Sequence, residues 1–502
     1  MALSKVRETP SQVQFVATPR EKEYREQLVD IYRAKIAEKE SSDMDIRTLV
    51  EVITDSIALS HHLLELGQER EANQIRKAAV KRLLTKAEQS EGEIFGLKDD
   101  IVALQEKMLP IQEKLVKHSE KQQELVDTNM RLVADYQALS ESEREAQKPA
   151  FEAASAKAEK EYNGFVEKNV NPLLKELEPL NKELQASSQK AQVLAQQALY
   201  LKASAINIMV ELENSAEALG LATSTLSKYY ANGIFGGAEG LVASALNANA
   251  KHVQEQVSRR DLHDMHRLHE LGVESAIEAA DTVENAVKNS GAPEDLLNFA
   301  VQFRQIGATI SASSGNTGDV EALLVAKSTE YVAEGHSALA DKMLIAASEI
   351  YHQAGHQLIN VHNATEARKV IDKSIELKLG VVERLESEVL LKPPVVVDQQ
   401  QAQMDALMAQ LTGQTQGNRG PTIDDAVKLR QDVVHLYVLN DKYKEALDML
   451  TEVAGKYKEA GYPDAQVALL EVGASVASEQ RSTLKSAARG LDEDGLRTGL
   501  YL

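Results

Sequence analysis

The most constraining feature of this sequence is a pair of apolar series, each with a 3.5-residue period, on either side of a short polar segment. Steps of three and four residues alternate from Ile101 to Leu139 and again from Val166 to Leu201. This period places a narrow stripe along one side of a helix, as coiled-coil packing requires. Because a short connection separates them, the two helices are predicted to form one antiparallel hairpin over residues 96–205. The series are Ile101, Leu104, Met108, Ile111, Leu115, His118, Gln122, Leu125, Asn129, Leu132, Tyr136 and Leu139, then Val166, Val170, Leu173, Leu177, Leu180, Leu184, Ser187, Ala191, Leu194, Ala198 and Leu201.

Two prolines are predicted to act as hinges in this hairpin. The polar run Ser140–Glu143 is interpreted as the turn, with a helix restarting at Pro149. With the tip near residues 144–145, Pro110 and Pro179 lie at one level on opposite helices. A proline inside a helix removes a backbone hydrogen bond and bends it. The prediction is a bend shared by both helices; the alternative is that each proline marks a plain helix break.

Composition favours helices packed on helices. The chain has 502 residues, of which 43% are hydrophobic and 26% charged, but only 4% aromatic, with no tryptophan. The absence of cysteine excludes disulfides, thiolate catalysis and cysteine-ligated metals. No signal sequence and no 18-residue apolar run are present, so a cytoplasmic protein without transmembrane helices is expected.

Charge argues against nucleic acid as the main partner. The formal net charge is −21, whereas phosphate binding needs concentrated positive charge. One basic run interrupts this acidity, but on a helix its members spread over more than one face, as on an ordinary solvated surface. It comprises Arg70, Arg76, Lys77, Lys81, Arg82 and Lys86.

Breaks in pattern predict five segments. A stretch rich in Gln, Gly and Pro runs from Lys392 to Pro421 and is the best linker candidate. The predicted segments are an N-terminal helical segment (1–95), the hairpin (96–205), a helical body (206–392), the linker with a short amphipathic helix (393–421) and a C-terminal helical hairpin domain (422–502).

Two stretches of about 30 residues resemble single tetratricopeptide repeats. Both lack the final proline of that repeat, and a third copy cannot be placed at the 34-residue period. The resemblance implies helical hairpins of tetratricopeptide type towards the C-terminus. It rests on Val433, Tyr437, Tyr443, Ala446 and Leu450, and on Tyr351, Gly355, Leu358, Ala367, Ile371 and Ser374.

The segment 229–247 concentrates glycine with aromatic and apolar residues. Two interpretations stay open: a buried connection between helices, or an apolar tongue that inserts into a membrane or binds a partner. The tongue residues would be Tyr229, Tyr230, Ile234, Phe235, Leu241 and Val242.

Histidines offer the main candidates for metal chemistry. His352 and His356 are four residues apart, and His352–His356 resembles the His-Glu-x-x-His signature of zinc peptidases. Gln353 replaces the general base of that signature, so a chance match, with Gly355 serving helix packing, is the main interpretation, and a non-catalytic metal site is the alternative. His263, His266 and His269 recur every three residues and diverge around a helix, which favours an ordinary polar face.

The linker contains one candidate docking motif. Met404, Leu407, Met408 and Leu411 have the spacing of an amphipathic helix, which can dock into the groove of a partner. Packing of this helix back onto its own protein is the alternative.

Together these patterns predict an all-α protein: a long antiparallel coiled-coil hairpin on a multi-helix body, with tetratricopeptide-like hairpins towards the C-terminus. The function expected is non-enzymatic, with no cofactor: the protein self-associates or scaffolds protein partners, and nucleic acid is not expected as a partner. One alternative is an α-helical pore-forming toxin subunit or membrane-remodelling protein, exported without a signal peptide, that uses residues 229–247. Another is a metal-dependent enzyme centred on His352 and His356.

Overall fold

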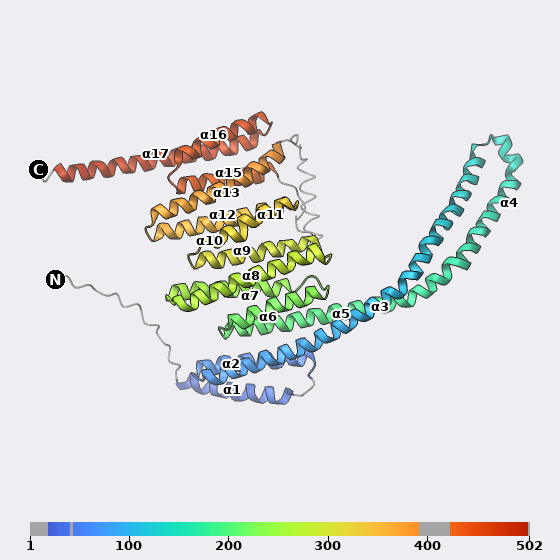
Figure 1. The fold of residues 1–502 in the computed structure, drawn as a ribbon, viewed down its shortest axis with the longest axis horizontal. Coiled ribbons are helices and arrows are strands. Elements are labelled where there is room, and N and C mark those ends of the chain that lie inside the picture. The colour runs from blue at the N-terminus through green and yellow to red at the C-terminus, as the bar shows by residue number, and fades with distance from the viewer. Residues whose placement is uncertain (1–18, 41–43, 391–421, 500–502) are drawn as a thin grey trace. The chain divides into compact units, whose positions relative to one another are not determined.

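The computed structural model describes residues 19–40, 44–390 and 422–499, and every regular element in these ranges is a helix (Figure 1). The predicted all-α fold is therefore confirmed. The chain divides into two compact units, residues 1–214 (unit 1) and 215–502 (unit 2).

Unit 1 combines a small helical base with a long hairpin. The base packs α1 and α2 on the first turns of α3 through Val29, Leu59, Leu63 and Ala72. The helices are α1 (Pro19–Lys39), α2 (Ile46–Glu65), α3 (Glu69–Ala138), α4 (Glu141–Phe165), a π-helical segment (Val166–Val170) and α5 (Asn171–Glu211).

The hairpin, residues 97–201 and called the arm below, confirms the predicted coiled-coil seam. Every residue of the two apolar series is buried or partly buried, while most residues between them are exposed. Gln122 Nε2 donates to the Tyr162 hydroxyl across the seam at 2.7 Å. Near the tip, the rings of Tyr136 and Phe151 stack with centroids 4.0 Å apart. The 3.5-residue period thus fixed which side of each helix is covered.

The position of the tip corrects the sequence prediction. Helix α3 ends at Ala138 and α4 begins at Glu141, so the chain reverses at Leu139 and Ser140, before residues 144–145. Ser140 caps α4 in a capping box with Glu143, whose carboxylate accepts the Ser140 backbone N–H at 3.0 Å. This local cap starts the helix at once, and Pro149 lies inside it.

The position of the tip also bears on the two prolines. Pro110 is inside α3 and Pro179 is inside α5. The rings of His118 and Phe165 meet with centroids 5.7 Å apart, although Phe165 is four residues farther from the tip than His118. The shared level of Pro110 and Pro179 therefore stays a prediction. Figure 1 shows both helices of the arm following one curve, and prolines and π-bulges are both known causes of such bends.

Unit 2 is an array in which α6 to α17 follow one another in chain order (Figure 1). Its helices are α6 (Ser215–Ala231), α7 (Glu239–Arg259), α8 (Leu262–Asn289), a 3-10 turn (Glu294–Leu296), α9 (Leu297–Ser313), α10 (Gly318–Val320), a π-helical segment (Glu321–Ala326), α11 (Lys327–Ala333), α12 (Ser337–Asn360), α13 (Ala364–Leu390), α15 (Ile423–Leu439), α16 (Tyr443–Glu459) and α17 (Pro463–Gly499).

One type of turn joins most of these helices. After α11, Gly335 adopts a φ of 91°, and the next N–H, of His336, bonds the Tyr331 carbonyl at 2.8 Å. This is the Schellman arrangement, which satisfies the last carbonyls of a helix and reverses the chain. The same left-handed residue and bond recur at Gly67, Glu213, Gly233, Arg260, Gly315, His362, Asp441 and Gly461.

Unit 2 contains an internal repeat, whose two copies begin at α9 and at α15. Helix α15 (423–439) repeats α9 (297–313) in length, and α17 begins after α15 at the same interval as α12 after α9. The two copies align without insertion. Identical residues at matched positions are Ala300 and Ala426, Val301 and Val427, Arg304 and Arg430, Gln305 and Gln431, Tyr331 and Tyr457, and Gly335 and Gly461.

The matched arginine and tyrosine of each copy bind a buried glutamate from a preceding helix. In the first, Glu284 accepts from Arg304 Nε and from the Tyr331 hydroxyl, both at 3.0 Å. In the second, Glu386 accepts from both Arg430 Nε at 2.8 Å and the Tyr457 hydroxyl at 2.7 Å. A buried carboxylate needs such partners to remain charged. The clusters tie α8 to α9 and α11, and α13 to α15 and α16.

Candidate interaction surfaces

The glycine-rich segment after α6 is a packed connection in unit 2. Tyr229, Tyr230, Leu241 and Val242 are buried, and Ile234 and Phe235 are partly buried. The Tyr230 hydroxyl donates to Glu239, the first residue of α7, and the Gly236 N–H donates to the same oxygen at 3.2 Å. Burial, followed by the bond to Glu239, raises the pKa of the Tyr230 phenol. The proposed tongue residues thus hold α6 against α7.

Among the described helices, none combines the length and apolar character that crossing a membrane requires.

The His352–His356 pair lies on α12. The two rings are close, with centroids 4.7 Å apart, and burial together with the His356 charge lowers the pKa of His352. Within the described ranges, no group of three His, Asp or Glu side chains is placed to hold a metal ion. Gly355 has a packing role, because a Cβ there would lie 2.6 Å from Ile371 Cγ1 of α13.

The three histidines of α8 lie in different environments. His269 is buried and lies 3.2 Å from the Ser311 hydroxyl of α9. His266 is exposed and pairs with Glu270 at 3.2 Å, and its ring stacks on that of His269 with centroids 6.3 Å apart, while His263 is exposed. The predicted divergence therefore does not hold for His266 and His269. The predicted docking residues Met404, Leu407, Met408 and Leu411 lie outside the described residues.

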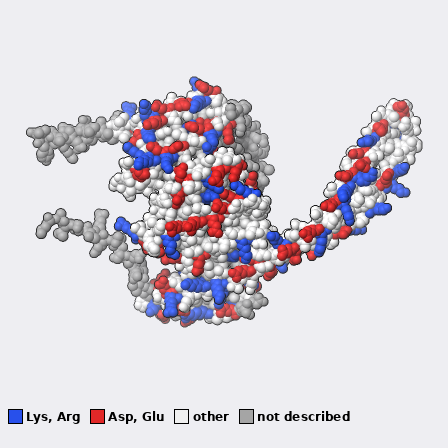
Figure 2. All heavy atoms as spheres, in the orientation of Figure 1, with Lys and Arg blue, Asp and Glu red and all other residues white. Residues whose placement is uncertain are grey.

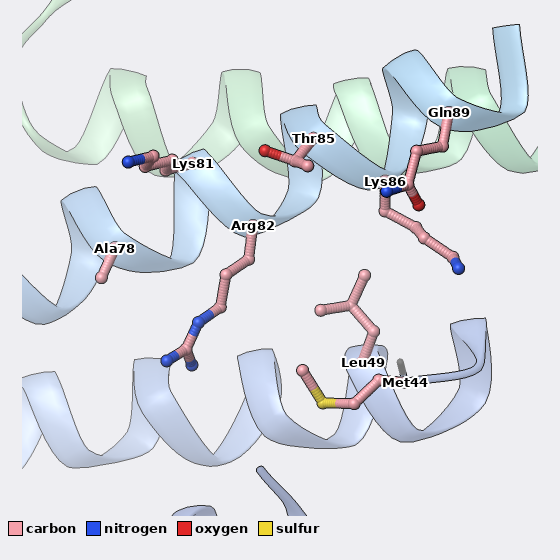
Figure 3. A pocket seen from close by; sticks show the side chains of 8 residues that line it. All are labelled: Met44, Leu49, Ala78, Lys81, Arg82, Thr85, Lys86 and Gln89. Carbon is pink, nitrogen blue, oxygen red and sulfur yellow. The ribbon is translucent and has the colours of Figure 1, made fainter. Parts of the chain in front are cut away.

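A hollow of about 390 Å³ opens between α2 and α3 (Figure 3). Met44 and Leu49 form an apolar side, and Arg82 and Lys86 reach from α3 towards them. Arg82 is paired with Glu40, and Arg76, further back on α3, is buried and lies 3.3 Å from Glu211. The residues of the basic run therefore lie in different surroundings, Arg82 beside Glu40 and Arg76 beside Glu211, as their spread over several faces of the helix predicts.

A larger groove, of about 620 Å³, lies in unit 2 among α12, α13 and α15. Its half-buried apolar residues are Ile345, Leu385 and Leu429. The groove is also lined by charged residues of both signs. The basic ones are Lys342 and Lys428, and the acidic ones are Asp341, Glu388 and Asp425. An apolar floor with mixed charges at the edge is typical of a surface that binds protein rather than a small charged metabolite.

The arm is the most extended surface of unit 1. It carries acidic and basic side chains along its length (Figure 2). At its root, Glu91 and Lys202 form a buried ion pair of 2.5 Å. Beyond that pair, apart from the seam, few residues are buried, so nearly all of the arm is available as surface.

No known protein family matches this chain, and no curated protein matches it. One solved structure that it resembles is described as a circular tandem repeat protein with novel repeat topology and enhanced subunit contact surfaces. That protein is 12% identical, and the match covers 93% of this chain and 98% of that one, with a TM-score of 0.25. A likeness at this level carries no argument about fold or function.

The repeat in unit 2 was accessible from sequence but not through a tetratricopeptide template. The segments Ala300–Gln305 and Ala426–Gln431 share the pattern Ala-Val-x-x-Arg-Gln, and Tyr331 and Tyr457 follow at equal distances. Of the two stretches that resemble tetratricopeptide repeats, one joins α15 to α16 inside the second copy, and the other joins α12 to α13.

Proposed function

We propose that this chain is a non-enzymatic helical scaffold, which self-associates or binds protein partners through the arm and the helix array of unit 2. The observation that carries the proposal is the arm itself. From Leu97 to Ala138, α3 spans about 60 Å at 1.5 Å per residue. Over this distance it buries little beyond one seam, so its length adds reach and surface rather than a core.

The groove among α12, α13 and α15 supports the second half of the proposal. Helix arrays expose grooves between successive repeats, and such surfaces commonly receive peptides or helices. Leu385 lies in this groove, is half-buried, and directly precedes Glu386 of the Glu386–Arg430 cluster.

The membrane alternative requires α6 and α7 to separate. Tyr229 and Val242 are fully buried, so exposing them would cost several kcal/mol of apolar burial. Because of that cost, the membrane alternative requires a trigger that rearranges α6 and α7. No observation favours the membrane alternative over the scaffold.

The test combines the molar mass of the purified full-length chain, by light scattering, with affinity capture from its source cells. Self-association or reproducible capture supports the scaffold, and Leu385→Glu should reduce capture that depends on the groove. A matched control is Val467→Glu, at an exposed position of α17 in the same unit. A strict monomer that captures nothing would overturn the proposal, and liposome leakage by the same sample would favour the membrane alternative.

A further inference from the structure

Helix α3 carries a second heptad series beside its seam. Each member directly follows a seam residue, so the series keeps the alternation of three and four residues over about five heptads. None of its members is charged, although charged residues make up 26% of the chain. The series is Val102, Gln105, Leu109, Gln112, Val116, Ser119, Gln123, Val126, Met130 and Val133.

The corresponding positions of α5 lie on the same flank of the arm. On α3 the alternation of three and four residues continues back from Ile101 to Leu97, Ile94 and Ser90. Glu91, which follows Ser90, and Lys202, which follows Leu201, meet across the hairpin at 2.5 Å. Glu93 and Lys190, which each precede a seam residue, meet on the opposite side at 3.7 Å. Residues that follow the seam in either helix therefore share one flank.

This flank is almost without charge on α5 as well. The π-helical segment contributes Glu167, and α5 contributes Asn171, Leu174, Glu178, Asn181, Gln185, Ser188, Gln192, Ala195, Leu199 and, at the root of the arm, Lys202. One of its two acids, Glu178, is paired with Lys182 at 2.7 Å. We call this surface of α3 and α5 the uncharged flank.

Large apolar side chains are exposed on the uncharged flank. Val102, Leu109, Val116, Met130 and Leu174 are 43%, 56%, 62%, 66% and 48% exposed. The opposite flank of α3 is different, since most of its positions are charged. It carries Asp100, Lys107, Lys114, Lys117, Lys121, Glu124, Arg131 and Asp135. A heptad series of exposed apolar residues needs another helix to cover it.

Charges of opposite sign border the uncharged flank. The α3 edge is acidic and the α5 edge is basic, each at a seven-residue spacing. The hairpin register places the three lysines within about one helical turn of the levels of Glu120, Glu113 and Glu106. The acidic edge is Asp99, Glu106, Glu113, Glu120 and Asp127, and the basic edge is Lys168, Lys175 and Lys182.

We infer that the uncharged flank binds a second copy of this chain, with the two arms face to face about a twofold axis along the arm. This inference rests on the proposed function and names the partner of the arm. With the arms parallel, the rotation brings the acidic edge of one copy against the basic edge of the other. With the arms antiparallel, acidic edges would meet each other, which is unfavourable. The product is a closed four-helix bundle, in which α3 packs on α5 of the other copy.

The first test measures the dissociation constant of the dimer. Val116→Glu, at the centre of the uncharged flank, should raise that constant at least tenfold. Val193→Glu is the matched control, because Val193 is 51% exposed on the opposite side of the arm and should leave the constant unchanged. Since both positions are exposed, circular dichroism should show unaltered helix content in each variant.

The second test addresses pairing and direction. Glu113→Lys and Lys175→Glu should each weaken the dimer, and the double variant should recover most of the loss. The chain has no cysteine, so a single Ser142→Cys variant can carry one spin label at each tip. Parallel arms place the two labels within roughly the width of a four-helix bundle, about 20–30 Å, whereas antiparallel arms separate them by roughly the length of the arm, about 60–80 Å.

The outcomes separate this inference from the proposed function. A monomeric chain that still captures partners through the Leu385 groove would overturn the inference alone. A dimer whose dissociation constant does not change in Val116→Glu would show that the uncharged flank is not the interface. A dimer whose tips are far apart would show that the arms are not parallel. Binding of another protein to the flank of a monomeric chain would equally exclude a second copy as the occupant.

Discussion

The arm and the helix array of unit 2 are both helical but are stabilised differently. In the arm, each helix has one neighbour and buries one seam. In the array, buried tyrosines such as Tyr331 and Tyr457 reach carboxylates on neighbouring helices, and small residues such as Gly355 allow close approach. Changes inside the array should therefore alter its stability, whereas changes on the arm surface should alter association.

The largest effect is expected at Arg430. Arg430→Met removes the two hydrogen bonds to Glu386 and leaves Tyr457 as the donor to that buried carboxylate within the cluster. Loss of one member of a buried ion pair costs about 3–5 kcal/mol. Hydrogen exchange of peptides from α13, α15 and α16 in the full chain would measure this loss as reduced protection.

The first copy of the repeat supplies the comparison. Arg304→Met should cost less, because Lys327 remains 3.0 Å from Glu284. Burial opposes ionisation of Glu284, but the hydrogen bonds and charges of Arg304 and Lys327 outweigh it and lower its pKa. On the arm, Lys121→Met breaks the exposed pair with Glu124, which lies away from the uncharged flank, and should leave protection unchanged. Equal losses in the array and the arm would refute the distinction between them.

A smaller loss is expected at Gly355. In Gly355→Ala, the new methyl group would lie 2.6 Å from Ile371 Cγ1, so α12 and α13 must move apart. Overpacking costs about 1–3 kcal/mol, and the better helix propensity of alanine offsets up to about 1 kcal/mol. A net loss of about 1–2 kcal/mol should appear in urea unfolding or in exchange of α12 and α13.

Gly380→Ala is the control for that substitution. Gly380 is also inside a helix of unit 2, but a Cβ there meets nothing within 4 Å. Its replacement should stabilise α13 by about 0.5–1 kcal/mol. If both alanine substitutions changed the free energy of unfolding in the same direction, the close approach of α12 and α13 would not explain the glycine at position 355.

The sequence predicted the arm well because one local rule decides it. A 3.5-residue period specifies which residues of α3 and α5 face each other, whatever the rest of the chain does. The tip was harder, since Ser140–Glu143 has a polar composition suited to a loop and to a helix start alike. Only the bond from the Ser140 N–H to Glu143 shows that it is a cap.

The surfaces of unit 2 were less accessible from sequence because burial there depends on distant helices. Tyr230 and Phe235 in a glycine-rich segment suit a tongue or a packed connection equally well. Glu239 decides between these in the structure by accepting the Tyr230 hydroxyl. The α3 half of the uncharged flank, by contrast, can be identified from the sequence of α3 alone. What the sequence alone does not show is that the matching residues of α5 lie beside it.

A gain in stability is expected within the seam of the arm. Asn129 is a seam residue whose Oδ1 is buried without a hydrogen-bond partner in the structure. Asn129→Leu removes that unsatisfied oxygen and should stabilise the outer arm by about 1–2 kcal/mol. The measurement is hydrogen exchange of peptides from α3 and α4 near the tip.

Gln122→Leu separates this effect from a general gain in hydrophobicity. Gln122 donates to the Tyr162 hydroxyl at 2.7 Å, so its replacement loses a bond as it adds apolar surface. The gain in protection should therefore be smaller than in Asn129→Leu. A larger gain at Gln122 would show that the unsatisfied oxygen of Asn129 has no energetic weight.

The smallest effect is expected at the tip, where Glu143 is fully exposed. Hydrogen bonds from the Ser140 hydroxyl and backbone N–H lower the pKa of Glu143 below its usual value of 4.5. Because the folded pKa is depressed, the cap contributes fully above the usual value and is lost as the pH falls through the depressed one. Carboxyl NMR titration of Glu143 should give a midpoint below 4.5, and Ser140→Ala should move it upward. Thr128→Ala, which removes a hydroxyl bonded to the Glu124 carbonyl instead, should leave it unchanged; an unchanged midpoint in Ser140→Ala would mean that the capping box does not persist in solution.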